Sequence, residues 1–155
     1  MARITFACRL ASHWFTHFPA CAMPMDGLYA TLDQLQAQRI QLGIVTNGSV
    51  RSQAAKIEAL ALAPYMNTIV ISEALGIKKP DPAIFAHALM EIGTEAQYTW
   101  FVGDHPVNDM LGAASCGLTP VWMHGSHAWP SREHAQPAMQ IERLSELIAL
   151  VAACH

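Results

Sequence analysis

Charged residues, long apolar runs and paired cysteines are all scarce in this sequence of 155 residues. Asp, Glu, Lys and Arg make up only 14% of the chain and the formal net charge is -3, so nothing favours nucleic acid or an anionic membrane as a partner. No apolar run approaches the roughly 18 residues of a membrane-spanning helix. The four cysteines are scattered without a Cys-x-x-Cys pair, which favours reduced thiols in a cytoplasmic protein over a disulfide or zinc framework.

Apolar residues are plentiful instead, at 52% of the chain, and most of them lie in short blocks. The blocks LGIVTNG, TIVIS, TWFVGD and TPVWM predict four buried strands. Between the strands, apolar residues recur at helical spacing, as they do after Asp81, a candidate N-cap, and Pro82. Buried strands that alternate with amphipathic helices predict an α/β fold, in which a parallel sheet carries helices on both faces.

The C-terminal part is predicted to hold a polar loop, HGSHAWPSREHAQP, and one last helix. The apolar stripe that predicts this helix consists of Ile141, Leu144, Leu147, Ile148 and Val151. Within the loop, the spacing of His124, His127 and His134 fits no common set of metal ligands, which favours a solvated loop.

A turn that can hold an anion follows the first of the predicted strands. It offers the Thr46 hydroxyl, the Asn47 amide and the backbone N–H groups around Gly48, just before a helix predicted to begin near Val50. A Thr-Asn-Gly turn alone is more often only a turn, so both interpretations stay open at this point.

Charged groups stand at two further loops of the predicted sheet. Lys79, held by the following proline, can neutralise anionic oxygens, and Asp104 and Asp109 are hard oxygen ligands that suit Mg²⁺. The alternatives are a solvated lysine and an ordinary helix cap. Because ligands bind at the carboxyl ends of parallel strands, we expect Thr46, Lys79 and Asp104 to converge at one edge of the sheet.

Taken in order, the motifs VTNG, GIKKPDPAIF and VGDHPVND resemble those of the haloacid dehalogenase (HAD) superfamily. The likeness is greatest to phosphatase-type members with a helical cap, and it covers roughly residues 24 to 125. This resemblance implies a Rossmann-like core and a Mg²⁺-dependent hydrolase.

The resemblance also implies a role for each matching residue. Thr46 corresponds to the hydroxyl that binds the transferring phosphoryl group, with help from the backbone of Asn47 and Gly48. Lys79 corresponds to the cation that stabilises that group. Asp104 corresponds to a magnesium ligand, and Asp109 to a carboxylate that supports the metal or its waters.

One family motif is missing, the D-x-D-x-T sequence that supplies the nucleophile and the general acid/base. The aspartates of this chain are Asp26, Asp33, Asp81, Asp104 and Asp109. MARITF resembles the start of the strand that carries the motif, and in that register Ala7 and Arg9 stand where the two carboxylates belong. Cys8 lies between them and is an alternative nucleophile, which the family's carboxylate chemistry disfavours.

The expected organisation is a single HAD-like domain over residues 1–155, with the cap largely absent. Residues 1–9 are expected to give the first strand, 10–25 a remnant of the cap, 26–125 the core, and 126–155 a loop and the C-terminal helix. Residues 3 to 7 are predicted to lie in the middle of the sheet.

Two functions are compatible with these features. The leading one is a Mg²⁺-dependent phosphatase of a small phosphomonoester, with this chain truncated or catalytically impaired and its Mg²⁺ weakly bound. The alternative is a non-catalytic module that binds a phosphorylated ligand or partner. A nicotinamide-binding domain is disfavoured because no G-x-G-x-x-G follows any strand.

Overall fold

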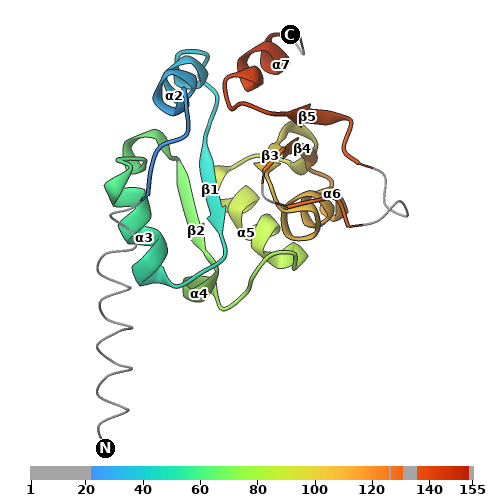
Figure 1. Ribbon diagram of the computed structural model, residues 1–155. Coiled ribbons are helices and arrows are strands. Elements are labelled where there is room, and N and C mark those ends of the chain that lie inside the picture. The colour runs from blue at the N-terminus through green and yellow to red at the C-terminus, as the bar shows by residue number, and fades with distance from the viewer. Residues whose placement is uncertain (1–21, 126, 131–135, 154–155) are drawn as a thin grey trace, which may run out of the picture.

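The computed structural model describes residues 22–125, 127–130 and 136–153, in which strands alternate with helices (Figure 1). The strands are β1 (Gly43–Thr46), β2 (Thr68–Ile71), β3 (Trp100–Gly103), β4 (Thr119–Met123) and β5 (Met139–Ile141). The α-helices are α2 (Leu28–Ala37), α3 (Val50–Ala59), α4 (Ser72–Leu75), α5 (Pro82–Ile92), α6 (Gly112–Ser115) and α7 (Glu146–Ala153). Short 3₁₀ turns, η2 (Ala63–Tyr65) and η3 (Ala96–Tyr98), and a π-helical segment, η4 (Pro106–Leu111), complete the described part.

All strand pairs in the described part are parallel, as the sequence predicts, and they form two sheets. In one sheet β1 pairs with β2, and in the other the order is β3-β4-β5. The four predicted strands are confirmed as β1 to β4. The prediction that Ile141 and Leu144 lie in the last helix is wrong. Ile141 lies in β5, where it is 2% exposed, and Leu144 lies in the turn before α7, which begins at Glu146.

Helix α5 begins where the sequence predicts. The Asp81 side chain accepts a hydrogen bond of 2.9 Å from the backbone N–H of Ala83, and Pro82 occupies the first turn, where its missing N–H costs nothing. The helix ends at Gly93, whose φ of 73° is a left-handed conformation that glycine adopts without strain.

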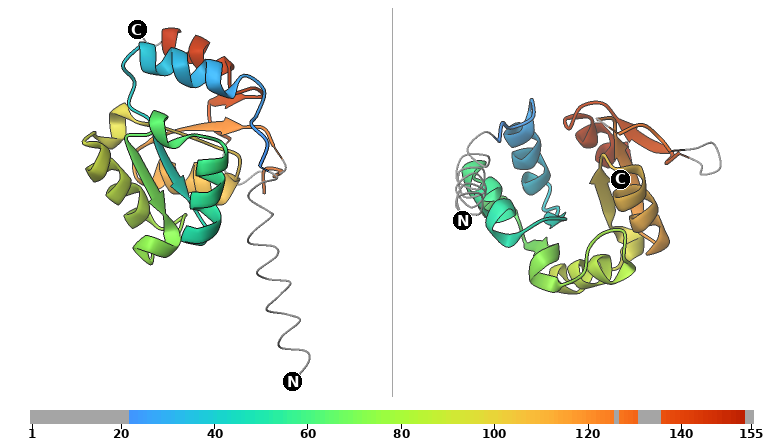
Figure 2. Two further views of the ribbon diagram at one scale, coloured as in Figure 1. Left: turned by 90° about the vertical axis from the view of Figure 1, so that its left-hand side faces the viewer. Right: turned by 60° about the horizontal axis from the view of Figure 1, so that its bottom comes forward.

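Strands β1 and β3 belong to different sheets and share no hydrogen bonds (Figure 1). Helix α5 joins the two sheets, because its buried Phe85 belongs to a core cluster against which Val45 of β1 and Phe101 of β3 both pack. The rings of Phe85 and Phe101 meet edge to face, with 5.0 Å between their centroids. Figure 2 shows the two sheets standing apart, with α5 bridging them.

A second contact between the two halves lies at the opposite end of the molecule. There α2, which precedes β1, contacts α7, which follows β5, as the left view of Figure 2 shows. Leu147 of α7 is buried with Val121 and Ile141 in a second core cluster beneath β4 and β5. The first and last described helices therefore lie side by side.

Residues 3 to 7, predicted to form the middle strand, lie outside the described residues, as does most of the predicted cap remnant. In the described part, β1 and β3 each pair on one edge only, and their residues are at most half-buried. This is unusual for apolar parallel strands, which are normally covered on every side.

Candidate active site at the carboxyl ends of the strands

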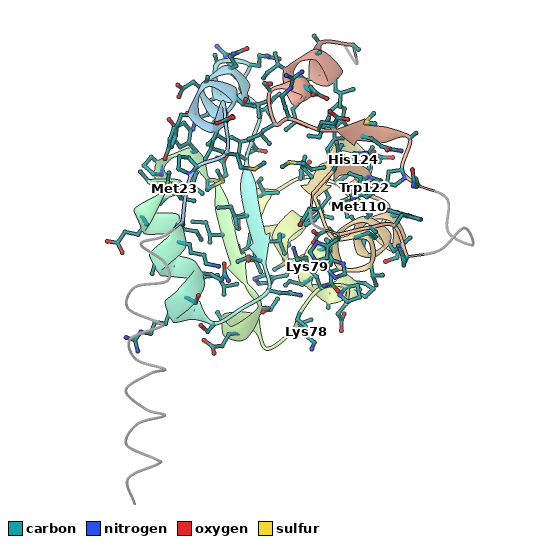
Figure 3. All side chains as sticks on the ribbon, in the orientation of Figure 1. Met23, Lys78, Lys79, Met110, Trp122 and His124 are labelled. Carbon is teal, nitrogen blue, oxygen red and sulfur yellow. The ribbon has the colours of Figure 1, made fainter. Side chains whose placement is uncertain are left out.

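Three loops meet where β1 and β3 end. One loop follows β1 and begins with Thr46 and Asn47, the second leads into α5 and carries Lys79, and the third follows β3 and carries Asp104. They are joined by hydrogen bonds and an ion pair between residues far apart in the sequence. Lys79, which takes part in these contacts, is labelled in Figure 3. The contacts connect Asn47, Lys79 and Asp109, while the convergence of the Thr46, Lys79 and Asp104 side chains stays a prediction.

The Asn47 side chain holds the backbone of Lys79 at two points. Its Oδ1 accepts a hydrogen bond of 2.9 Å from the Lys79 N–H, and its Nδ2 donates one of 3.0 Å to the Lys79 carbonyl oxygen. Since the two contacts use the acceptor and the donor of one carboxamide, they also fix the orientation of that group. The polar atoms of the Asn47 side chain thus bind the backbone of Lys79.

The side chain of Lys79 reaches Asp109. Its Nζ lies 2.7 Å from Oδ1 of Asp109, and the two side chains are only 11% and 8% exposed. The same ammonium lies 5.2 Å from the centroid of the Phe101 ring. The other carboxylate oxygen of Asp109 accepts a hydrogen bond of 3.0 Å from the His105 N–H. One carboxylate therefore links the lysine loop to the loop after β3.

The hydroxyl of Thr46 is held by a side chain of α3, the helix that follows its loop. It donates a hydrogen bond of 3.2 Å to Oε1 of Gln53, whose Nε2 lies 3.4 Å from the Asn47 carbonyl oxygen. Gly48 has a φ of 148°, and an added Cβ there would come within 2.5 Å of Nε2 of Gln53. Gly48 therefore permits the side chain of Gln53 to lie close to the loop.

The loop after β1 is also tied to the end of β2. The Gly48 N–H donates a hydrogen bond of 3.0 Å to the Ser72 hydroxyl, and the Val50 N–H donates one of 2.7 Å to Oε2 of Glu73. A carboxylate thus already occupies a donor at the N-terminus of α3, where the sequence suggested that an anion could bind. These two donors can bind a phosphoryl group only by giving up their present partners.

Asp104 points to groups other than Lys79. Its Oδ2 lies 3.0 Å from Nδ1 of His127, and its backbone oxygen accepts a hydrogen bond of 3.2 Å from the Trp122 indole. The rings of His105 and His127 lie 4.6 Å apart. Sequence reasoning placed His127 in a solvated loop, and the contact with Asp104 was missed because nothing in the spacing indicates it.

The third loop has a second feature that sequence reasoning missed. Nδ1 of His105 accepts hydrogen bonds from the N–H groups of Val107 and Asn108, at 3.2 and 3.1 Å, and so caps the π-helical segment η4. This places the proton of the neutral imidazole on Nε2. The sequence predicts a regular helix here, and the structure has η4 followed by the short α6.

The described residues offer an incomplete set of ligands for the Mg²⁺ that the HAD resemblance implies. They include no group of three or more His, Cys, Asp or Glu side chains that could hold a metal ion. Asp109 directs both oxygens to protein groups, and Asp104 alone offers too few ligands. The described residues therefore do not fit Mg²⁺ by themselves, and the assignments of Asp104 and Asp109 to a metal stay predictions.

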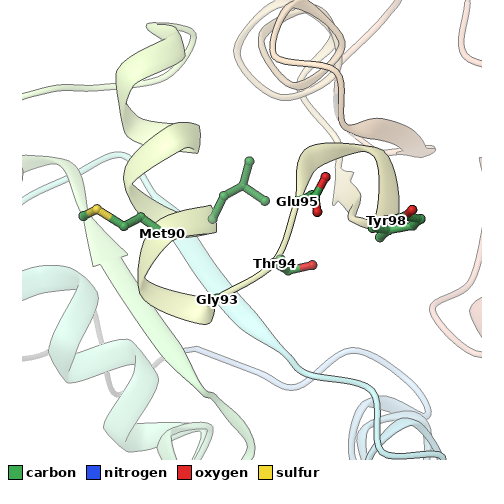
Figure 4. Close-up of a pocket in the computed structure, with 6 residues that line it drawn as sticks. Met90, Gly93, Thr94, Glu95 and Tyr98 are labelled. Carbon is green, nitrogen blue, oxygen red and sulfur yellow. The ribbon is translucent and has the colours of Figure 1, made fainter.

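A pocket described elsewhere on the surface is separate from this site (Figure 4). It lies between the end of α5 and η3, ahead of β3, and its volume is about 410 Å³. Met90 and Tyr98 in its lining are 72% and 76% exposed. Its position before β3 places it away from the loops that follow β1 and β3.

Comparison with protein families gives a match to the Haloacid dehalogenase-like hydrolase family over residues 8–123. Curated relatives include the pyrimidine 5'-nucleotidase YjjG of Escherichia coli, which is 31% identical over 129 residues, covering 83% of this chain and 56% of the relative. A ribulose-1,5-bisphosphate 5-phosphatase of Halopiger xanaduensis is 30% identical over 148 residues, or 91% of this chain and 62% of the relative.

Solved structures agree with these matches. The putative HAD hydrolase YfnB of Bacillus subtilis superposes with a TM-score of 0.81 at 27% identity, over 89% of this chain and 60% of YfnB. A 2-haloacid dehalogenase of Pseudomonas syringae superposes with a TM-score of 0.73 at 32% identity, over 86% of this chain and 55% of the dehalogenase. The chain spans little more than half the length of these proteins.

Within the described residues, no helix is both long and apolar enough to cross a membrane. The parallel α/β architecture, the meeting of the three loops and the match over residues 8–123 agree with one another. This chain belongs to the haloacid dehalogenase-like hydrolase family.

Proposed function

We propose that the chain is the core part of a phosphomonoester hydrolase of the HAD type, and that its own residues bind and orient the phosphoryl group. The observation that carries the proposal is the chain of contacts from Asn47 through Lys79 to Asp109. It joins the three loops that the family resemblance assigns to phosphoryl transfer. The relatives named as phosphatases support the substrate class.

In this proposal each group has a separate task. The Lys79 ammonium neutralises charge on the phosphoryl oxygens, which is the main requirement of phosphoryl transfer. The Thr46 hydroxyl turns from Gln53 to donate to one oxygen, and the backbone N–H of Asn47 donates to another. Asp109 keeps Lys79 in place while the site is empty of substrate.

Two expected parts of the machinery are not supplied by the described residues. The first is Mg²⁺, which would supply positive charge to the transferring group in a phosphatase of this kind. We expect this chain to bind Mg²⁺ weakly, because Asp109 is already paired with Lys79 and Asp104 alone offers few ligands. The second is the nucleophile, because none of the five aspartates of the chain stands in a D-x-D sequence. We therefore propose that this chain is catalytically impaired.

The substrate is proposed to be a small phosphorylated molecule, with no nucleic acid or membrane as partner. Relatives of similar identity act on substrates as different as pyrimidine nucleotides, glyceraldehyde 3-phosphate and phosphoserine by their names. That range supports the phosphomonoester class without selecting one member. The oligomeric state is not part of the proposal.

The test is phosphate release from an aryl phosphate with and without Mg²⁺, for the full chain and for Asp104→Ala. We expect both proteins to stay at background, because loss of a covalent nucleophile commonly costs several orders of magnitude in rate. Mg²⁺-dependent release by the full chain that disappears in Asp104→Ala would overturn the impairment, and Cys8 would be the first nucleophile to examine.

The second candidate is a binding module without turnover, and the buried Lys79–Asp109 pair favours it. Lys79 could bind a phosphoryl oxygen in place of the Asp109 carboxylate, and binding of this kind needs no nucleophile. Binding of inorganic phosphate to the full chain that is lost in Lys79→Ala, with no turnover in either protein, would support this module over the impaired enzyme.

A further inference from the structure

We propose that Asn47 is a positioning residue, whose side chain sets the place of Lys79 and through it the Lys79–Asp109 pair. The proposal rests on the proposed function for the meaning of Lys79, but the contact itself stands without it. It assigns the Asn47 carboxamide a task other than touching the phosphoryl group. The backbone N–H of Asn47 remains the part that is proposed to face the ligand.

The first argument is the reciprocity of the two hydrogen bonds. Asn47 and Lys79 lie 32 positions apart, yet one carboxamide satisfies both backbone polar groups of Lys79, at 2.9 and 3.0 Å. These are ordinary lengths for strong N–H···O bonds. Both contacts are partly buried, so a side chain without the carboxamide would leave two backbone groups without partners.

The second argument is what Lys79 does with its other end. Its Nζ is 2.7 Å from Oδ1 of Asp109, and Asp109 is itself held by the His105 N–H at 3.0 Å. The lysine is thus fixed at its backbone by the loop after β1 and at its ammonium by Asp109, beyond the end of β3. A long flexible side chain has to lose considerable rotamer freedom to do this, so a fixed backbone makes the contact less costly.

The third argument is that no other described contact holds the Lys79 backbone to β1. Neighbouring Lys78 is exposed, and its carbonyl oxygen accepts only the local turn bond from the Asp81 N–H. Without the side chain of Asn47, the loop before α5 would be fixed by that turn and by α5 itself. Lys79 would then lose its tie to the strand that carries Thr46.

The test compares how fast an acylating reagent modifies Lys79 and Lys78 in the full chain, with Lys78 as the internal reference. Asn47→Ala is expected to raise the Lys79-to-Lys78 ratio about fivefold, the factor that corresponds to one net hydrogen bond of ordinary strength. Asn47→Asp keeps the acceptor for the Lys79 N–H and loses the donor. Its Lys79-to-Lys78 ratio is therefore expected to lie between those of the unmodified chain and Asn47→Ala.

Asn67→Ala is the matched control. Oδ1 of Asn67 also accepts a backbone hydrogen bond, of 3.0 Å from the Leu42 N–H, but at the opposite end of β1. Its ratio is expected to equal that of the unmodified chain. Equal ratios in Asn47→Ala and Asn67→Ala, or an Asn47→Asp ratio no lower than that of Asn47→Ala, would overturn the positioning role.

A measurement on the unmodified chain keeps the proposal testable even where a variant fails to fold. The Lys79 amide proton, donated to Asn47, is expected to exchange with deuterium well below the rate of an unstructured loop, and exchange at that rate would overturn the proposal. Inorganic phosphate is a separate arm: failure to protect Lys79 from acylation counts against the proposed function and leaves the Asn47 result unaffected.

Discussion

Gly103, the last residue of β3, lies where the site leaves no room for a side chain. A Cβ added there would come within 2.6 Å of Oδ2 of Asp109 and 2.7 Å of its Cβ. Asp109 is 5% exposed and paired with Lys79, so it has little freedom to move away. The absence of a side chain at residue 103 is therefore a condition for the ion pair.

We expect Gly103→Ala to lower the free energy of unfolding by about 1–3 kcal/mol, the usual cost of overpacking a tight interior. Urea unfolding of the variant and the unmodified chain measures the difference. Gly76→Ala is the comparison, because its added Cβ meets nothing within 4 Å and its cost comes only from a φ of 73°. A Gly103→Ala chain as stable as the original would contradict the close approach.

The structure shifts the pKa of the Tyr65 phenol. Its hydroxyl donates a hydrogen bond of 3.0 Å to Oδ1 of Asp33, and this bond, followed by burial and by the Asp33 charge, raises the pKa of Tyr65 above the ordinary value of 10.0. Because the folded state holds the phenolic proton more tightly, the contact stabilises the fold below pH about 10 and is lost as the pH rises through the folded pKa.

We expect Asp33→Asn to move the ultraviolet titration of one tyrosine back toward its ordinary pKa, because the amide removes the negative charge. Tyr65→Phe identifies which of the three tyrosines of the chain is responsible. If the titration curves of the unmodified chain and of Asp33→Asn coincide, this interpretation is wrong.

At the level of residues, the sequence predicted the groups of the site better than their partners. Lys79 and Asp109 stand out by type and by position in a motif, but their ion pair joins residues 30 positions apart and leaves no local pattern. The same holds for Asn47, whose side chain was expected to sit beside an anion. Contacts of this kind depend on the packing of loops, which single-sequence periodicity does not report.

At the level of elements, prediction succeeded where apolar periodicity was long and capping was clear. Helix α5 has both an Asp–Pro start and a five-residue apolar stripe. Strand β5 was missed because it has three residues, and Ile141 fits a helical stripe as well as a strand. The π-helical turn of η4 follows from the His105 cap and the Asp109 contact, neither of which has a sequence signal.

The unpaired edges of β1 and β3 lead to a prediction about residues 3 to 7. An apolar strand placed between these edges would satisfy the N–H and C=O groups that face the gap. We expect hydrogen exchange in the full chain to show the amides of β1 and β3 protected on both edges. Alternate amides that exchange freely would contradict the predicted central strand.

A proline substitution tests which segment supplies that protection. Thr5→Pro removes one N–H and cannot continue a central strand, so it should abolish the protection on the inner edges. Thr16→Pro, outside the predicted strand, is the matched control and should leave it intact. Protection that depends on protein concentration would instead point to pairing between two copies of the chain.

At the level of the whole molecule, Phe85 of α5 lies in the core where the two halves meet. It is 1% exposed and belongs to the core cluster shared with residues of β1 and β3. We expect Phe85→Ala to cost about 3–5 kcal/mol. The exposed Met90 of the same helix, 72% accessible, is the control, and Met90→Ala should change stability by less than about 0.5 kcal/mol.

The two sheets should also lose their cooperativity in Phe85→Ala. Amide exchange of β2 reports on one half and that of β4 on the other, and in the unmodified chain both should open with the same free energy. After the substitution the two values should separate. A large loss of stability with the two values still equal would show that α5 is not the link between the halves.

The contact between α2 and α7 also bears on how quickly the chain unfolds. Each sheet closes over a short stretch, since Gly43 pairs with Thr68 and Trp100 with Thr119, whereas α2 and α7 lie at opposite ends of the described chain. Short closures are favoured early, and long ones gain nothing until the parts between them are formed. The α2–α7 contact should therefore form after the rate-limiting step, so that weakening it speeds unfolding and leaves the refolding rate unchanged.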